Sequence, residues 1–108
     1  MDGRFVVTGL GVVTSIGIGL DEFWPALISG KNGISRLTRF DASDYPSTMA
    51  SEVRDFDPVR WIDRKSAARM DRFTQFAVAA SDLAMADAGL GSGSFDGDRA
   101  GAIVGSGI

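Results

Sequence analysis

The apolar residues of this chain fall into two short runs and two helical repeats. Residues 4–8 and 100–104 hold consecutive apolar β-forming residues with little polar alternation, which predicts two buried strands. Between them, apolar residues recur at intervals of three and four at 24–28 and at 73–88, which predicts two amphipathic helices. Strands that are separated by helices indicate an α/β fold in which the two strands run parallel.

Helix start and stop signals place three helical segments at residues 21–29, 57–69 and 72–88. Asp21 opens the first segment, Asp57-Pro58 opens the second and Asp71 precedes the third, each in the position that an N-cap takes. Gly30 and Gly89 follow the first and third segments, as expected of helix stops.

Three stretches read as irregular. Residues 14–20 contain two glycines and predict a loop, and residues 91–97 predict a Gly/Ser turn. Residues 31–57 predict a long excursion with one short strand. Two strands make a sheet too small to be stable alone. We therefore expect residues 1–108 to be the start of a larger domain, without an internal boundary.

Composition excludes several classes of function. The 108 residues are 44% hydrophobic and 23% charged, with a net charge of -3, which argues against a general nucleic-acid binder. There is no Cys and no His, so a disulfide, a Cys/His zinc site, a Cys nucleophile and a His base are all excluded within this chain. No metal or cofactor is expected. No secretory signal and no apolar run of the ~20 residues that span a membrane are visible, so a cytoplasmic protein is expected.

Two glycine-containing motifs invite a functional interpretation. Gly9-Leu10-Gly11 follows the first predicted strand, but a dinucleotide site needs a third glycine and a helix at once, so tight backbone packing is the favoured interpretation. Gly105-Ser106-Gly107 lacks the spacing of a nucleophile elbow and has no His to activate the serine. Ile108 beside it is a core or pocket-lining residue by default.

Basic residues cluster in one part of an otherwise acidic chain. On a helix, Lys65, Arg69 and Arg72 would share one face at spacings of four and three, which is compatible with a docking patch for an acidic partner. The other interpretation is a solvated surface whose cations pair with Asp63 and Asp71, and the residues alone favour it. The cluster comprises Arg60, Arg64, Lys65, Arg69 and Arg72.

An ordered set of short motifs resembles the β-ketoacyl-acyl carrier protein synthases, type II in particular. No single motif is diagnostic, but their order and spacing match over essentially all 108 residues. The motifs are Val6 to Gly11, Trp24 with Leu27, Gly30, Gly33-Ile34, Phe40-Asp41, Arg64-Lys65, Arg69-Met70-Asp71, Phe73, Ala88-Gly89-Leu90 and Gly101 to Ile108.

The resemblance implies a thiolase-like fold with α-β-α-β-α layers, of which this chain is the early part of the first half-domain. It also implies a homodimer that extends fatty acids by decarboxylative Claisen condensation of malonyl-acyl carrier protein with an acyl-enzyme thioester. In the family a Cys carries the acyl chain and two His assist the reaction, all downstream of the matched segment. No catalytic residue is therefore carried over, and the 108-residue chain alone is expected to be inactive.

Two binding roles follow from the resemblance. Lys65 and Arg69 match positions that face the acidic acyl carrier protein, and Arg64 lies beside them. Ala68 departs from the family pattern, in which a basic residue is common, so the patch is expected to be weaker. Ile108 matches a position that lines the acyl pocket, where a bulky side chain moves aside to admit chains.

Two alternatives remain open. One is a condensing subunit of polyketide synthesis, either an active ketosynthase or its Cys-less chain-length partner. The other is a non-enzymatic module that binds carrier protein. A Cys and two His in the sequence that follows would distinguish an active ketosynthase from a Cys-less partner.

Overall fold

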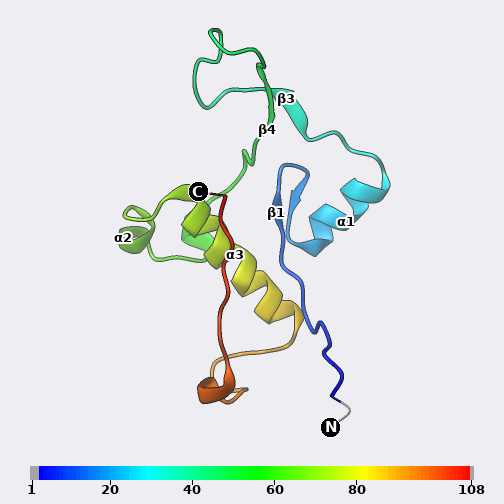
Figure 1. Ribbon diagram of the computed structural model, residues 1–108, viewed down its shortest axis with the longest axis vertical. Helices are drawn as coiled ribbons and strands as arrows, with labels where there is room; N and C mark the ends of the chain where they lie inside the picture. The colour runs from blue at the N-terminus through cyan, green and yellow to red at the C-terminus, as the bar shows by residue number, and fades with distance from the viewer. Residues whose placement is uncertain (1–2, 108) are drawn as a thin grey trace. The chain divides into compact units, whose positions relative to one another are not determined.

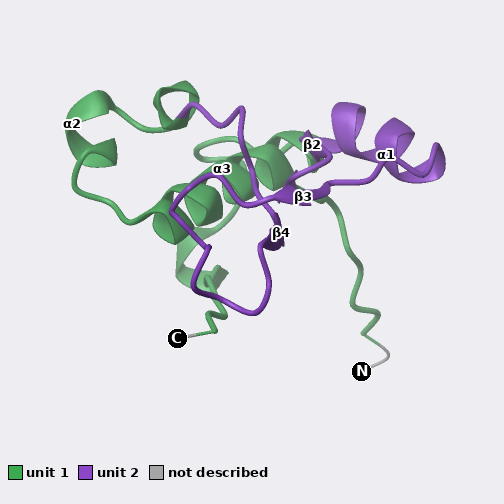
Figure 2. Cartoon of the chain, turned by 90° about the horizontal axis from the view of Figure 1, so that it is seen from above, with its two compact units in different colours: residues 1–11, 58–108 green, residues 12–57 purple. Residues whose placement is uncertain are grey.

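The computed structural model describes residues 3–107, which form two compact units (Figure 1). One unit is the continuous stretch Val12–Asp57. The other combines the residues before Val12 with those from Pro58 onward, so Val12–Asp57, the excursion unit, is inserted in sequence between the two parts of the other unit (Figure 2). No helix within the described part of the chain is long and apolar enough to cross a membrane.

The excursion unit opens with a tight hairpin where the sequence predicts a loop. Strand β1 (Val13–Thr14) pairs antiparallel with β2 (Gly17–Ile18), and the Thr14 hydroxyl donates to the Gly17 carbonyl at 2.8 Å. A side-chain hydrogen bond of this kind closes a turn locally, and apolar periodicity does not reveal it.

Helix α1 (Leu20–Ile28) begins one residue earlier than predicted, so the expected cap Asp21 lies in the first turn instead. The predicted stop at Gly30 is confirmed. Its φ of 74° is in the left-handed region, and its N–H bonds the Leu27 carbonyl at 3.1 Å while Lys31 N–H bonds Ala26 at 3.0 Å. This pair of bonds is the Schellman motif, which satisfies the last carbonyls of a helix.

Two strands, not one, form in the long excursion. Strand β3 (Ile34–Arg36) pairs antiparallel with β4 (Met49–Ser51), with Arg36 opposite Met49 and Ile34 opposite Ser51. The loop between them carries an edge-to-face contact of Phe40 and Tyr45, whose ring centroids are 5.8 Å apart.

The other unit, residues 1–11 and 58–108, contains the remaining helices. The predicted helical segment at 57–69 is interrupted: a 3-10 turn η1 (Pro58–Arg60) is followed by the one-turn helix α2 (Arg64–Ala67). The long helix α3 (Arg72–Asp87) is confirmed with Asp71 as its N-cap residue, although the Asp71 side chain makes no capping bond. A second Schellman motif ends α3 at Gly89, and the 3-10 turn η2 (Gly97–Arg99) follows the predicted Gly/Ser turn.

The predicted strands at 4–8 and 100–104 are absent from the described residues, and so is the predicted parallel pairing. Both segments are extended but irregular, and Phe5, Val7 and Ile103 are exposed. A strand is defined by its hydrogen-bonded neighbour, and neither segment has one among residues 3–107. The prediction that residues 1–108 lack an internal domain boundary stays a prediction.

Segments far apart in sequence meet along α3. A Cβ atom on Gly11 would collide with the Ala80 carbonyl, and one on Gly9 would lie 2.7 Å from the Ala88 nitrogen. Between the two glycines, Leu10 N–H donates to Asp87 Oδ2 at 2.9 Å. The close packing that the sequence favoured for Gly9-Leu10-Gly11 is thereby confirmed, and no helix follows the motif as a dinucleotide site would need.

Candidate functional site

The basic cluster is built around α2. Arg64 and Lys65 occupy the first two positions of this helix, and Arg69 follows its C-cap residue Ala68. All three side chains are exposed. Arg72 belongs to α3 instead, so the prediction that Lys65, Arg69 and Arg72 share one helix face is wrong.

The carboxylate nearest in sequence does not neutralise these cations. Asp63 is the N-cap of α2, and its Oδ1 accepts a hydrogen bond from Ser66 N–H at 2.9 Å. The hydrogen bonds from Ser66 lower the pKa of the Asp63 carboxyl below its usual value. Within residues 3–107, no ion pair joins Arg64, Lys65 or Arg69 to a carboxylate, so the predicted pairing of these three with Asp63 and Asp71 is wrong.

Two further arginines of the cluster lie against aromatic rings. The Arg60 guanidinium is 4.8 Å from the Trp61 ring centroid, and that of Arg72 is 5.0 Å from the Phe76 centroid. Such cation–π contacts fix a long side chain without removing its charge. Arg60 and Arg72 therefore differ from Arg64, Lys65 and Arg69, which make no such ring contact within residues 3–107.

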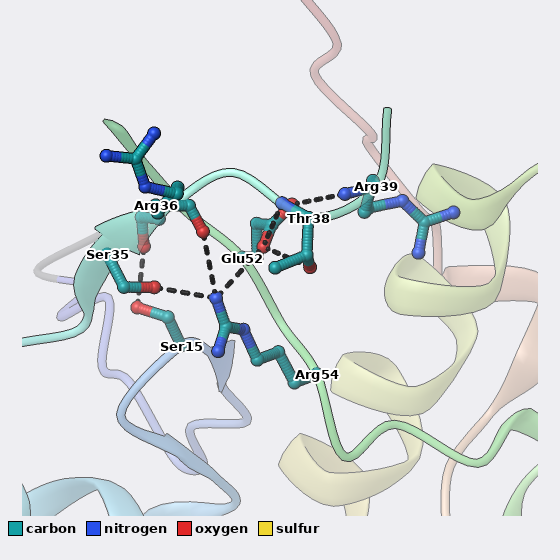
Figure 3. A network of polar contacts seen from close by, with 8 residues as sticks. Ser15, Ser35, Arg36, Thr38, Arg39, Glu52 and Arg54 are labelled. Atoms are coloured by element: carbon teal, nitrogen blue, oxygen red, sulfur yellow. Dashed lines mark hydrogen bonds and ion pairs between the residues drawn. The ribbon is translucent and has the colours of Figure 1, made fainter. Parts of the chain in front are cut away.

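The sequence did not predict a second polar centre, which lies within the excursion unit (Figure 3). The Glu52 carboxylate accepts hydrogen bonds from Thr38 N–H at 3.0 Å, the Thr38 hydroxyl at 2.9 Å and Arg39 N–H at 3.0 Å. Arg54 Nη2 lies 3.3 Å from Glu52 Oε2 and also donates to Ser35 Oγ at 2.7 Å. These bonds connect residues in and after β3 with the residues that follow β4.

Hydrogen bonding keeps Glu52 ionised. The Thr38 backbone bond is the main cause that lowers the pKa of Glu52 to about 2, and the Glu52 side chain is only 6% exposed. A carboxylate with this pKa is a poor general base near neutral pH. Glu52 therefore has a structural role in holding the hairpin.

A hollow of about 520 Å³ lies beside this network, lined by polar residues that include Ser15, Ser35 and Arg54. The Ser15 and Ser51 hydroxyls bond to each other. The chain has no His to activate either serine. Among residues 3–107, no three acidic side chains are placed to hold a metal ion. Among the described residues, the hollow therefore contains neither a Ser-His pair nor a cluster of three metal ligands.

The structure locates only part of the predicted binding residues. Arg64, Lys65 and Arg69 lie together at α2, whereas Ile108 lies outside the described residues. Sequence reasoning missed the Glu52 network because its partners are 13 and 14 residues away across a hairpin that was not predicted.

A family model described as Beta-ketoacyl synthase, N-terminal domain, matches residues 2–108. The chain therefore belongs to the β-ketoacyl synthase family. Among curated relatives, the 3-oxoacyl-[acyl-carrier-protein] synthase 2 of Synechocystis sp. is 50% identical over 105 residues, which is 97% of this chain and 25% of that protein. The putative β-ketoacyl synthase 2 of granaticin polyketide synthesis from Streptomyces violaceoruber is 44% identical over 88 residues, 82% of this chain and 21% of that protein.

Solved structures agree on the fold. The ishigamide ketosynthase/chain length factor aligns with a TM-score of 0.73 and 44% identity over 81% of this chain and 22% of its own. A β-ketoacyl synthase from Burkholderia phymatum aligns with a TM-score of 0.61 and 38% identity over 87% of this chain and 22% of its own. The helices and short strands of this chain thus match part of the thiolase-like ketosynthase fold. The chain spans about a quarter of the length of the relatives that it matches.

Proposed function

We propose that residues 1–108 form the N-terminal segment of a condensing enzyme of fatty-acid biosynthesis, a 3-oxoacyl-acyl carrier protein synthase. The observation that carries the proposal is the 50% identity to a 3-oxoacyl-[acyl-carrier-protein] synthase 2 over 97% of this chain. Relatives of the same name from Coxiella burnetii and Staphylococcus aureus, which are 46% and 41% identical over 97% of this chain, support the proposal.

The proposed reaction joins two thioesters. A Cys thiolate holds the acyl chain, malonyl-acyl carrier protein loses carbon dioxide, and the resulting carbanion attacks the acyl thioester. The Cys thiolate then leaves, and a β-ketoacyl product stays on the carrier protein. This chain holds neither Cys nor His, so the nucleophile and the groups that stabilise the developing charge lie in other parts of the enzyme. The chain by itself is inactive under this proposal.

The contribution of this segment to binding is a docking surface for acyl carrier protein, formed by Arg64, Lys65 and Arg69. The three cations are exposed and form no ion pair with a carboxylate in the described part of the chain, which supports it, because an acidic partner gains most from charges that are not already neutralised. Ile108 forms one wall of the acyl pocket and gates entry of the chain; this rests on its match to the family position. We also propose a homodimer in the cytoplasm, which the family resemblance supports.

A second candidate is a subunit of a polyketide synthase. The 44% identity to the granaticin synthase and the likeness to the ishigamide ketosynthase/chain length factor favour it. The fatty-acid enzyme ranks first because the relatives with that name reach higher identity over more of the chain. In an active ketosynthase both candidates use the same condensation, so the product rather than the reaction type separates them.

The test uses the intact protein, expressed from the complete coding sequence that contains residues 1–108. It is incubated with acyl-acyl carrier protein and malonyl-acyl carrier protein from fatty-acid synthesis, and carrier-bound products are followed by mass spectrometry. We expect one two-carbon extension to a β-ketoacyl product. An intact protein that accepts only a polyketide carrier protein would support the second candidate, and a coding sequence without a nucleophilic Cys would contradict the proposed catalysis.

A further inference from the structure

Helix α2 is too short to hold its own shape. It has four residues, Arg64–Ala67, whereas isolated helices of fewer than about 12–15 residues are marginal in water. Two of its four residues are the exposed cations Arg64 and Lys65, so burial of their side chains does not anchor it. The geometry of these cations must therefore be fixed by contacts at the ends of the helix.

Side chains from outside the helix bond both of its ends. At the start, Asp63 Oδ1 accepts from Ser66 N–H at 2.9 Å. At the end, Gln75 Nε2 of α3 donates to the Ala67 carbonyl at 2.9 Å, eight residues away in sequence. Ala67 itself is buried, as is Ile62 just before the helix. The turn is thus seated on an apolar contact and closed by one hydrogen-bonding side chain at each end.

We propose that Asp63 and Gln75 are positioning residues for the docking surface, which hold Arg64 and Lys65 in the arrangement that an acidic partner protein recognises. The inference rests on the proposed function of Arg64, Lys65 and Arg69. The inference goes beyond the proposed function because neither Asp63 nor Gln75 carries a positive charge, and because Gln75 lies in α3 rather than in α2. A partner that binds preorganised cations does not have to order them, so binding costs less conformational entropy.

Asp63 offers a sharp test because its two possible effects have opposite signs. Its negative charge lies next to the cations and would repel an acidic partner, whereas its capping bond holds the helix that presents them. Asn caps a helix about as well as Asp, and Ala does not cap. Asp63→Asn therefore keeps the cap and removes the charge, and Asp63→Ala removes both.

Gln75→Met supplies the matching test at the other end. Methionine has a similar length but no donor, so the bond to Ala67 is lost while every charge of the surface stays. Ser81→Ala is the control on the same helix. It removes a side-chain bond to the Ala77 carbonyl within α3, which does not involve α2.

Two measurements on the intact enzyme separate the steps of the inference. Hydrogen exchange of the amides at 66–68 reports whether α2 is held. KM for malonyl-acyl carrier protein, compared with KM for the same malonyl thioester on pantetheine alone, reports docking, because pantetheine lacks the protein surface. We expect faster exchange and a KM for the carrier-protein substrate that rises about fivefold in Asp63→Ala and Gln75→Met, the factor that corresponds to loss of a typical N-cap. KM for the pantetheine substrate and kcat should stay unchanged.

Asp63→Asn should retain slow exchange and bind the carrier protein at least as well as the unmodified enzyme, and Ser81→Ala should match that enzyme in both measurements. Faster exchange in Asp63→Ala and Gln75→Met without a rise in KM would overturn the positioning role. Tighter docking in both Asp63 variants would show that its charge alone matters, which also overturns it. Failure of the unmodified enzyme to use carrier-bound substrates would instead count against the proposed function.

Discussion

The contact between Gly11 and α3 allows a mutational effect to be worked out in advance. A Cβ atom at Gly11 would meet the Ala80 carbonyl, the Ala84 nitrogen and, at 3.0 Å, Leu83 Cβ. The first two of these are helix backbone, which cannot rotate away as a flexible side chain could. Gly11→Ala therefore forces the segment and α3 apart.

The expected magnitude is the difference of two effects. Overpacking a closely packed contact costs typically about 1–3 kcal/mol. Replacing Gly by Ala also restricts the unfolded chain, which stabilises by about 0.4–1 kcal/mol where the native backbone allows it. The net expectation is a loss of about 1–2 kcal/mol in the free energy of unfolding.

Equilibrium urea unfolding of the intact protein measures this change as a lower midpoint at an unchanged m-value. Gly91→Ala is the matched control, since a Cβ there meets nothing within 4 Å and its φ is not left-handed. We expect that variant to be as stable as the parent or slightly more so. Equal stability of Gly11→Ala and Gly91→Ala would refute the packing argument.

Three further predictions concern charge and chain length. Because the Glu52 pKa is lowered to about 2, the contribution of this carboxylate to stability should be complete above the unfolded pKa of about 4.3 and disappear as pH falls towards 2. The difference in unfolding free energy between the parent and Glu52→Gln should therefore shrink over that pH range, and a constant difference would contradict this. Lys65→Glu combined with Arg69→Glu should raise KM for carrier-bound malonyl substrate more than tenfold at low salt and less at high salt, measured by steady-state kinetics with the unmodified enzyme as reference. Ile108→Phe in the intact enzyme should shorten the acyl chains that are accepted, as read from product masses, and an unchanged chain-length profile would count against the gate.

Local signals in the sequence predicted the helices well. Periodicity and an Asp before the first turn placed α3 to within a residue, and Gly30 and Gly89 end their helices with the bonds expected of a left-handed glycine. Each of these features depends on residues at most five positions apart. Such features can be read from sequence because the partners are close along the chain.

Apart from the close packing of Gly9-Leu10-Gly11, features that depend on distant partners were not predicted. Phe5 and Val7 have the composition of a strand, but their segment has no paired neighbour among residues 3–107, and β-propensity describes fit to a sheet rather than a preference of the isolated segment. The Glu52 network and the bond from Gln75 to Ala67 join residues that carry no mutual signal in one sequence. The basic residues of the proposed docking surface were found from sequence, whereas the hydrogen bonds that Asp63 and Gln75 make to the ends of α2 were not.

The hydrogen bond from Leu10 to Asp87 joins residues 77 positions apart, which has a consequence for synthesis on the ribosome. At about 5–20 residues per second, Asp87 is made about 4–15 s after Leu10. During that interval Gly9, Leu10 and Gly11 have no helix α3 to pack against. Non-local contacts of this kind form late and leave apolar segments open to aggregation. Residues 9–11 are therefore expected to reach their packed conformation only after α3 has been made.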